Sequence, residues 1–206
     1  MMKDNIRAVI TLAVITLVSG VLLGFVFELT KQPIAAEEER ARQAACKSVF
    51  ESAESFVPYE GFDEAAAKTA LSEAGFSQES IDGVLTALDA SGNKLGYVIN
   101  VITMEGYGGE IDISMGVAND GTLNGIEILS IGETAGLGMK ADTPEFKAQF
   151  RNKNVTQFTY TKSGAASDYE IDALSGATIT TNAMVNAVNA GLCCFNMLEG
   201  GNGNEG

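Results

Sequence analysis

The sequence contains no histidine, and this absence excludes several kinds of chemistry. Histidine is the commonest general base, the usual axial ligand of haem and a ligand in most transition-metal sites. A Ser-His catalytic triad is therefore impossible in this chain. We assign no catalytic residue and no metal ligand from the sequence.

Cysteine is also scarce, and the three thiols are Cys46, Cys193 and Cys194. A ferredoxin-type cluster takes four thiolates and a structural zinc site usually takes four nitrogen or sulfur ligands, so the chain alone builds neither. The odd number argues against a complete disulfide framework. We interpret the adjacent Cys193 and Cys194 as small apolar residues packed against the core. Any redox function must then come from an organic cofactor.

Basic residues are few, with 13 Lys and Arg against 27 Asp and Glu and a formal net charge of −14. A nucleic-acid partner needs a basic protein face, so this composition argues against one. The same charge would repel an anionic lipid surface. Attachment to a membrane must therefore come from insertion of apolar residues.

Residues 8–27 form such an apolar run, AVITLAVITLVSGVLLGFVF, without a charge. About 20 residues rising about 1.5 Å each span a hydrocarbon core, so we predict one transmembrane helix within residues 1–29. The alternative is a cleaved signal peptide, whose apolar region is normally shorter, and residues 28–32 are a poor cleavage site. Basic residues flank the run on both sides and do not decide its orientation.

The next 53 residues, 30–82, are predicted to be a helical linker region. Pro33 suits the first turn of a helix, and residues 34–56 are rich in Ala and Glu with apolar residues on one face. Residues 65–74 predict a second, short helix, which Gly75 ends.

From Gly83 the pattern changes to short β-rich segments at 84–89, 94–104, 111–119 and 122–131, which predict successive antiparallel hairpins. A short helix at 144–150, a strand at 155–162 and a helix at 180–198 follow. We therefore expect an α+β domain over 83–198, with an antiparallel sheet and flanking helices. The Gly- and Asn-rich tail, 199–206, is expected to be disordered.

Residues 172–181 lie directly before the last predicted helix and are rich in Ser and Thr. A helix start offers unpaired N–H groups and the positive end of the dipole to an anion, and Gly176 allows close backbone approach. The cluster is therefore a candidate phosphate site. The alternative interpretation is that these hydroxyls merely cap the helix.

Within this segment, D-x-x-S-G-A-T at 172–178 resembles the motif on which a flavin transferase esterifies the phosphate of FMN to the final Thr. Residues 106–111 resemble the family pattern G-Y-x-G-x-I, and residues 133–138 resemble its E-T-P-G-L-G loop. With its N-terminal anchor, the chain resembles the G subunit of the Rnf ferredoxin:NAD oxidoreductase complex, over roughly residues 95–192 and the anchor. Ala135 and Ile131 depart from the family, which usually has Pro and often His there.

The resemblance implies covalent FMN on Thr178, with Ser175, Gly176 and Ala177 around the attachment point and Asp172 recognised by the transferase. It also implies that the 133–138 loop lies against the isoalloxazine, so the further cofactor-binding candidates are Glu133, Thr134, Leu137 and Gly138. Without the other motifs, Gly136 and Gly138 are equally well explained as parts of a tight turn.

The implied function is electron transfer by a subunit of a redox-driven translocase, without substrate chemistry of its own. Implied partners are the other Rnf subunits, the membrane, and an FAD:protein FMN transferase during maturation. The implied location is the cell (inner) membrane, as a single-pass protein with its soluble domain on the extracytoplasmic side. The alternatives are the C subunit of the Na+-translocating NADH:quinone oxidoreductase, which is usually longer, and a flavin-free membrane-anchored binding module.

Overall fold

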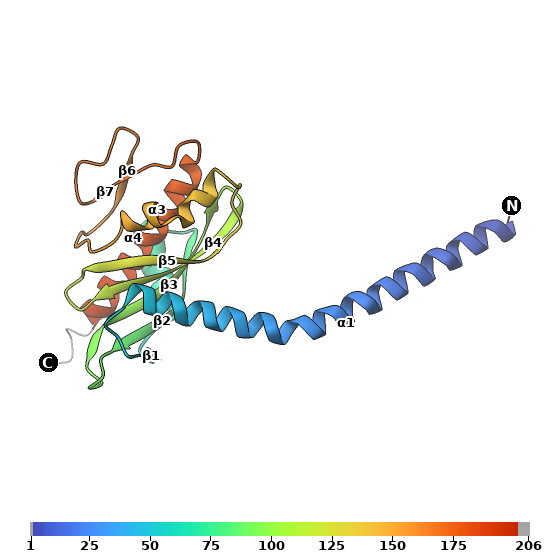
Figure 1. The fold of residues 1–206 in the computed structure, drawn as a ribbon, viewed down its shortest axis with the longest axis horizontal. Helices are drawn as coiled ribbons and strands as arrows, with labels where there is room; N and C mark the ends of the chain where they lie inside the picture. The colour runs from blue at the N-terminus through green and yellow to red at the C-terminus, as the bar shows by residue number, and fades with distance from the viewer. Residues whose placement is uncertain (1, 202–206) are drawn as a thin grey trace. The chain divides into compact units, whose positions relative to one another are not determined.

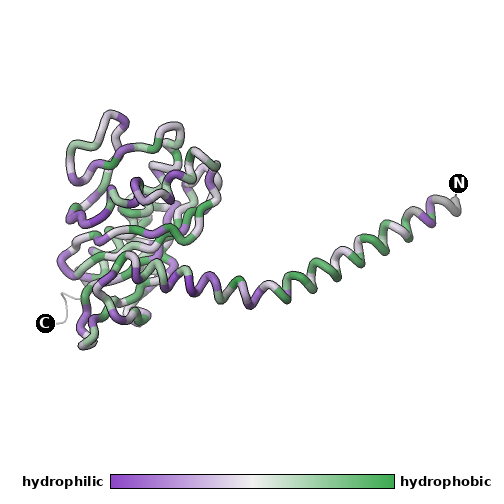
Figure 2. The backbone as a smooth tube through the Cα atoms, in the orientation of Figure 1, coloured by the Kyte–Doolittle hydropathy of each residue, from purple (hydrophilic) through white to green (hydrophobic). Residues whose placement is uncertain are grey.

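The structure, a computed structural model, describes residues 2–201 and divides into two compact units with a boundary between Ala41 and Arg42. The first unit is the N-terminal part of helix α1 (Met2–Val49). Among the described residues α1 is the helix long and apolar enough to cross a membrane, and Figure 2 shows its hydrophobic stretch. The described side chains of this stretch are exposed. The predicted membrane helix is therefore present.

The helix start predicted at Pro33 is wrong, because Pro33 lies inside the continuous α1. A proline within a helix removes one backbone donor and crowds the preceding turn. The Ala- and Glu-rich sequence that follows consists of strong helix formers, which favours continuation of the helix. The helix ends at Val49 rather than near residue 56.

The second unit is built on a five-stranded antiparallel sheet with the order β1-β2-β3-β4-β5 (Figure 1). Its strands are β1 (Ser55–Pro58), β2 (Glu79–Leu88), β3 (Lys94–Gly106), β4 (Gly109–Ala118) and β5 (Leu123–Ile131). Each pairs with the next along the chain, which confirms the predicted hairpins. β1 is short and ends in Pro, and it was not predicted from the sequence.

One face of the sheet packs against helix α4 (Thr178–Gly201). Alternate residues of β3 and β4, such as Ile99 and Ile113, are fully buried there, as the two-residue period of strands requires. The backbone of α4 comes so close that a Cβ built on Gly191 would lie 2.0 Å from the Sδ of Met115. The opposite face is covered by the end of α1 through Val49 and its neighbours.

Smaller elements complete the second unit, and they are α2 (Glu64–Glu73), the 3-10 helix η1 (Gly138–Asp142), α3 (Pro144–Ala148), β6 (Thr159–Thr161) and β7 (Glu170–Asp172). The strand predicted at 155–162 is reduced to β6, and it pairs in parallel with β7, which was not predicted. Asn189 of α4 holds this region, because its side chain exchanges hydrogen bonds of 2.7 and 2.9 Å with the backbone of Phe158.

Two predicted boundaries differ from the structure. The domain was expected to begin at Gly83, which lies inside β2, whereas the compact unit begins at Arg42 and includes β1 and α2. The predicted disordered tail began at Glu199, but α4 continues to Gly201 and Glu199 forms an ion pair with Lys94 at 2.5 Å. Residues 202–206 of that predicted tail lie outside the described residues.

None of the three cysteines forms a disulfide in the described part of the chain, and Cys46 and Cys194 are buried. Burial raises the pKa of Cys194 to about 12, so this thiol stays protonated and unreactive at neutral pH. Burial also raises the pKa of Cys193, in the same helix. These environments agree with the interpretation of the pair as small apolar residues.

Candidate functional site

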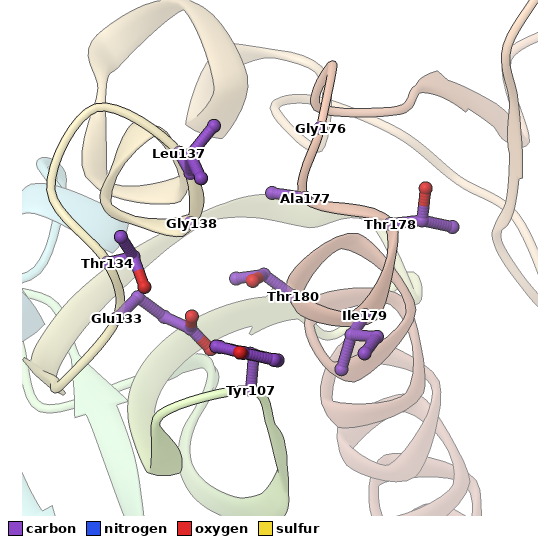
Figure 3. Close-up of a pocket in the computed structure, with 10 residues that line it drawn as sticks. All are labelled: Tyr107, Glu133, Thr134, Leu137, Gly138, Gly176, Ala177, Thr178, Ile179 and Thr180. Atoms are coloured by element: carbon purple, nitrogen blue, oxygen red, sulfur yellow. The ribbon is translucent and has the colours of Figure 1, made fainter.

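A pocket of about 560 Å³ lies where three segments that are distant in the sequence meet (Figure 3). Its volume falls within the range of roughly 300 to 1,000 Å³ that is usual for small-molecule sites. The lining residues come from the β3–β4 turn, the loop before η1 and the start of α4, and they are Tyr107, Glu133, Thr134, Leu137, Gly138, Gly176, Ala177, Thr178, Ile179 and Thr180. The three sequence motifs therefore converge on one space.

Helix α4 begins at Thr178, and its first backbone bond runs from the N–H of Thr181 to the carbonyl oxygen of Ala177 at 3.0 Å. The N–H groups of residues 178 to 180 therefore precede the intrahelical ladder. Together with the helix dipole they favour an anion at this end. Thr178 is half-buried beside them.

The turn before α4 is held by Thr181, which is fully buried. Its Oγ1 accepts a hydrogen bond from the N–H of Leu174 at 3.0 Å and donates one to the carbonyl oxygen of Ala177 at 3.0 Å. Gly176 adopts a φ of +77°, which favours glycine. Thr181 therefore fixes the turn that precedes the helix, and the side chain of Thr178 takes no part in these two hydrogen bonds.

The loop before η1 packs directly on the start of α4. A Cβ built on Gly138 would lie 2.5 Å from Oε2 of Glu133 and 2.7 Å from Oγ1 of Thr180, so only glycine fits there without a shift. Gly136 has open space but a φ of +77°. The tight-turn interpretation therefore suits Gly136, whereas Gly138 allows the close approach of the two segments.

Glu133 joins this loop to the β3–β4 turn. Its side chain is buried, and Oε1 accepts a hydrogen bond from the N–H of Gly108 at 3.3 Å. A Cβ on Gly108 would lie 2.2 Å from the carbonyl oxygen of Gly132, so the two backbones are in contact. Glu133 therefore fixes two walls of the pocket to each other.

Comparison with known proteins agrees with this geometry. Residues 106–192, which include all three pocket segments, match the FMN-binding domain family, and residues 1–49 match the RnfG N-terminal region. The chain is therefore similar to Rnf complex G subunits in its N-terminal region and to FMN-binding domains in its second unit.

Two G subunits of related complexes are similar to this chain over different shares of its length. The G subunit of the ion-translocating oxidoreductase complex of Methanosarcina acetivorans is 29% identical, and the alignment covers 96% of this chain and 98% of that protein. The G subunit of the proton-translocating ferredoxin:NAD(+) oxidoreductase complex of Clostridium ljungdahlii is 37% identical over 47% of this chain and 52% of its own length.

A solved structure shares the fold. The C subunit of the Na(+)-translocating NADH-quinone reductase of Parabacteroides distasonis superposes with a TM-score of 0.52 and 20% identity, covering 76% of this chain and 89% of that one. This likeness confirms the predicted α+β class of the second unit.

Most of the site residues predicted from the sequence line the pocket, and the exception is Ser175, which is exposed on the turn. Asp172 lies in β7, where its Oδ1 accepts a hydrogen bond from the N–H of Ala165 at 2.7 Å. Thr180, which belongs to the candidate phosphate site at 172–181, also lines the pocket, whereas Tyr107 and Ile179 line it without having been assigned to it. Tyr107 is the named aromatic residue at the second position of the G-Y-x-G-x-I motif, and this was a signal that could have identified it.

The lining residues suit FMN in two ways. The apolar side chains of Tyr107, Leu137 and Ile179 offer surface to a planar ring system, while the helix start and the hydroxyl of Thr178 offer donors to a phosphate. No Lys or Arg is among the lining residues, so a phosphate here depends on backbone donors, hydroxyls and the helix dipole.

Proposed function

We propose that this chain carries FMN as a phosphoester on Thr178 and passes electrons within a membrane-bound, ion-translocating ferredoxin:NAD oxidoreductase complex. The observation that carries the proposal is the pocket at the start of α4, where the attachment motif, the 133–138 loop and the β3–β4 turn meet. When bound, FMN supplies the electron-accepting and electron-donating chemistry that the side chains lack.

Thr178 suits the attachment better than the neighbouring threonines. Its side chain is half-buried and takes no part in the two hydrogen bonds of Thr181, whereas Thr180 and Thr181 are almost completely buried. Thr178 and Thr180 also project in different directions from the helix start (Figure 3). A transferase that must reach a hydroxyl therefore finds Thr178 accessible in the folded domain.

The attachment reaction balances with FAD as donor. The Oγ of Thr178 forms a bond to the phosphorus of the FMN half, the pyrophosphate bond of FAD breaks, AMP leaves and the hydroxyl proton is released. An FAD:protein FMN transferase would catalyse this step during maturation. Asp172 would take part in recognition, although its carboxylate also holds the loop at Ala165.

The pocket lining contains no cationic side chain, which explains why a covalent bond would be needed to retain the cofactor. A free phosphate is held tightly when Arg or Lys adds charge-assisted hydrogen bonds. Here the helix end contributes about 0.3 to 1 kcal/mol in typical surface geometries, which is too little to retain a cofactor. The ester would therefore retain FMN while the apolar walls orient its ring and exclude water.

The remaining parts of the assignment concern location and partners. The relatives are named as subunits of ion-translocating complexes, so we assign the other Rnf subunits as partners and α1 as the membrane anchor. The domain after α1 is placed on the extracytoplasmic side of the cell (inner) membrane, where the family's transferase acts.

The test is the intact mass of the full chain after co-expression with the transferase. The wild-type chain should gain the mass of one FMN less one water and should fluoresce in a denaturing gel, whereas Thr178→Ala should do neither. Thr180→Ala is the matched control and should retain the label. An unlabelled wild type would favour the flavin-free binding module, and a labelled Thr178→Ala would place the ester elsewhere.

A further inference from the structure

We infer that Tyr107 is a cofactor-contact residue that stacks its ring on the flavin and shields it from water. This inference rests on the proposed function, because it assigns a residue to the same pocket. Tyr107 is 71% exposed, although large aromatic side chains usually gain stability by burial. A solvent-exposed aromatic ring in the lining of a pocket can stack on a planar ligand.

Exposed apolar side chains concentrate at this pocket. In the described part of the second unit the exposed large apolar residues are Val57, Met104, Tyr107, Leu137, Tyr169 and Ile179. Tyr107, Leu137 and Ile179 all line the pocket, although they come from three separate segments. Isolated exposed residues need no explanation, but a group around one concavity marks a binding site.

The backbone beneath Tyr107 is held in place on both sides. Gly106 pairs with Gly109 across the hairpin, so Tyr107 and Gly108 form its tip. The N–H of Gly108 donates to Oε1 of Glu133, and the tip lies against the backbone of Gly132. The exposure of Tyr107 therefore belongs to a fixed tip and not to a free loop.

The helix start is fixed to the same strand end. Glu105, at the end of β3, accepts hydrogen bonds from the Nδ2 atoms of Asn182 and Asn186 at 3.3 and 2.6 Å. These hydrogen bonds join the end of β3, next to Tyr107, to helix α4, which begins at Thr178. A flavin anchored at Thr178 would be free to turn about its phosphate and ribityl chain, and Tyr107 would limit that freedom by offering an aromatic stacking partner.

Stacking on a tyrosine has an optical consequence that attachment alone does not have. The phenol gives an electron to the photoexcited flavin and receives it back, so the fluorescence is quenched without net chemistry. Tyr107→Leu should therefore raise the flavin's quantum yield and lifetime toward those of free FMN. It should also make the flavin more accessible to iodide.

The experiment uses the full chain, flavinylated by its transferase and purified in detergent. Tyr107→Leu and Tyr107→Phe are compared with Tyr169→Leu, which removes another exposed tyrosine from a different surface concavity. Label content is measured by intact mass in every sample. Tyr107→Phe should retain the protection from iodide, because the ring remains, but should lose much of the quenching.

The outcomes separate the two proposals. Labelled Tyr107→Leu with longer fluorescence lifetime, beside an unchanged Tyr169→Leu, supports the inference. If labelled Tyr107→Leu has the lifetime and iodide quenching of the wild type, Tyr107 does not contact the flavin and the attachment proposal is unaffected. If the wild type itself carries no FMN, both proposals are overturned.

Discussion

Asp112 offers a quantitative test of how the sheet is held to the end of α1. Its side chain is 11% exposed, Oδ1 has no hydrogen-bond partner, and Oδ2 lies 3.9 Å from Nη2 of Arg42. Burial raises the pKa of Asp112 to about 6, against the opposing effect of Arg42 and with smaller contributions from Asp82 and Glu110. At neutral pH the fold therefore contains a charged, incompletely paired carboxylate.

The sign of the effect follows from proton binding. Between the ordinary pKa of 3.8 and about 6, the folded state binds more protons at Asp112 than the unfolded state does, so stability falls as pH rises through this interval. The shift of about two units corresponds to at most about 3 kcal/mol. Screening by solvent lowers this contribution, so we expect the charged Asp112 to reduce the stability of the fold by about 1 to 2 kcal/mol.

Asp112→Asn keeps the shape and removes the charge. The variant should be more stable than the wild type by about 1 to 2 kcal/mol near pH 8, and the gain should shrink toward zero near pH 4. Urea unfolding of the detergent-solubilised chain, followed by circular dichroism at both pH values, measures this difference.

The control for this prediction is Asp82→Asn. Asp82 pairs with Arg42 at 2.9 Å, and both side chains are about 40% exposed, so its loss should cost at most about 1 kcal/mol. Loss of stability in Asp112→Asn near pH 8 would refute the reasoning, because the attraction to Arg42 would then exceed the cost of burying the carboxylate.

Two further predictions concern the flavin and the topology. Leu137→Ala should leave the fluorescent label intact but raise the reduction potential of the flavin, because water that reaches the ring stabilises its charged reduced forms. Redox titration measures the shift in potential, which is about 59 mV for each tenfold change in the equilibrium constant of a one-electron step. An unchanged potential and flavin spectrum would remove the 133–138 loop from the site. Protease added to intact protoplasts should digest the chain after Lys31, whereas protection until permeabilisation would place the domain on the cytoplasmic side.

Local patterns in the sequence were sufficient for several parts of this protein. The uncharged run at 8–27 predicts a membrane helix, because a bilayer selects segments by length and polarity alone. The hairpins β2 to β5 follow from short β-rich segments joined by turn residues such as those at 91–93 and 119–121. The attachment motif could be placed before a helix because capping and helix periodicity are local properties.

Contacts between distant segments decided the rest. The strand predicted at 155–162 is reduced to β6, and it pairs in parallel with β7, a strand of three residues that the sequence did not predict. The division of roles between Thr178 and Thr181 depends on hydrogen bonds to Leu174 and Ala177.

The pocket itself is the clearest product of tertiary structure. It forms because Gly138 allows the loop before η1 to touch Thr180 and because Glu133 binds the β3–β4 turn that carries Tyr107. Those contacts join residues that are separated by 25 to 42 positions, and no local pattern encodes such distances. The sequence alone therefore determined the long apolar helix, the hairpins and the place of the D-x-x-S-G-A-T motif before a helix, whereas only the folded chain decided which side chains share one cavity.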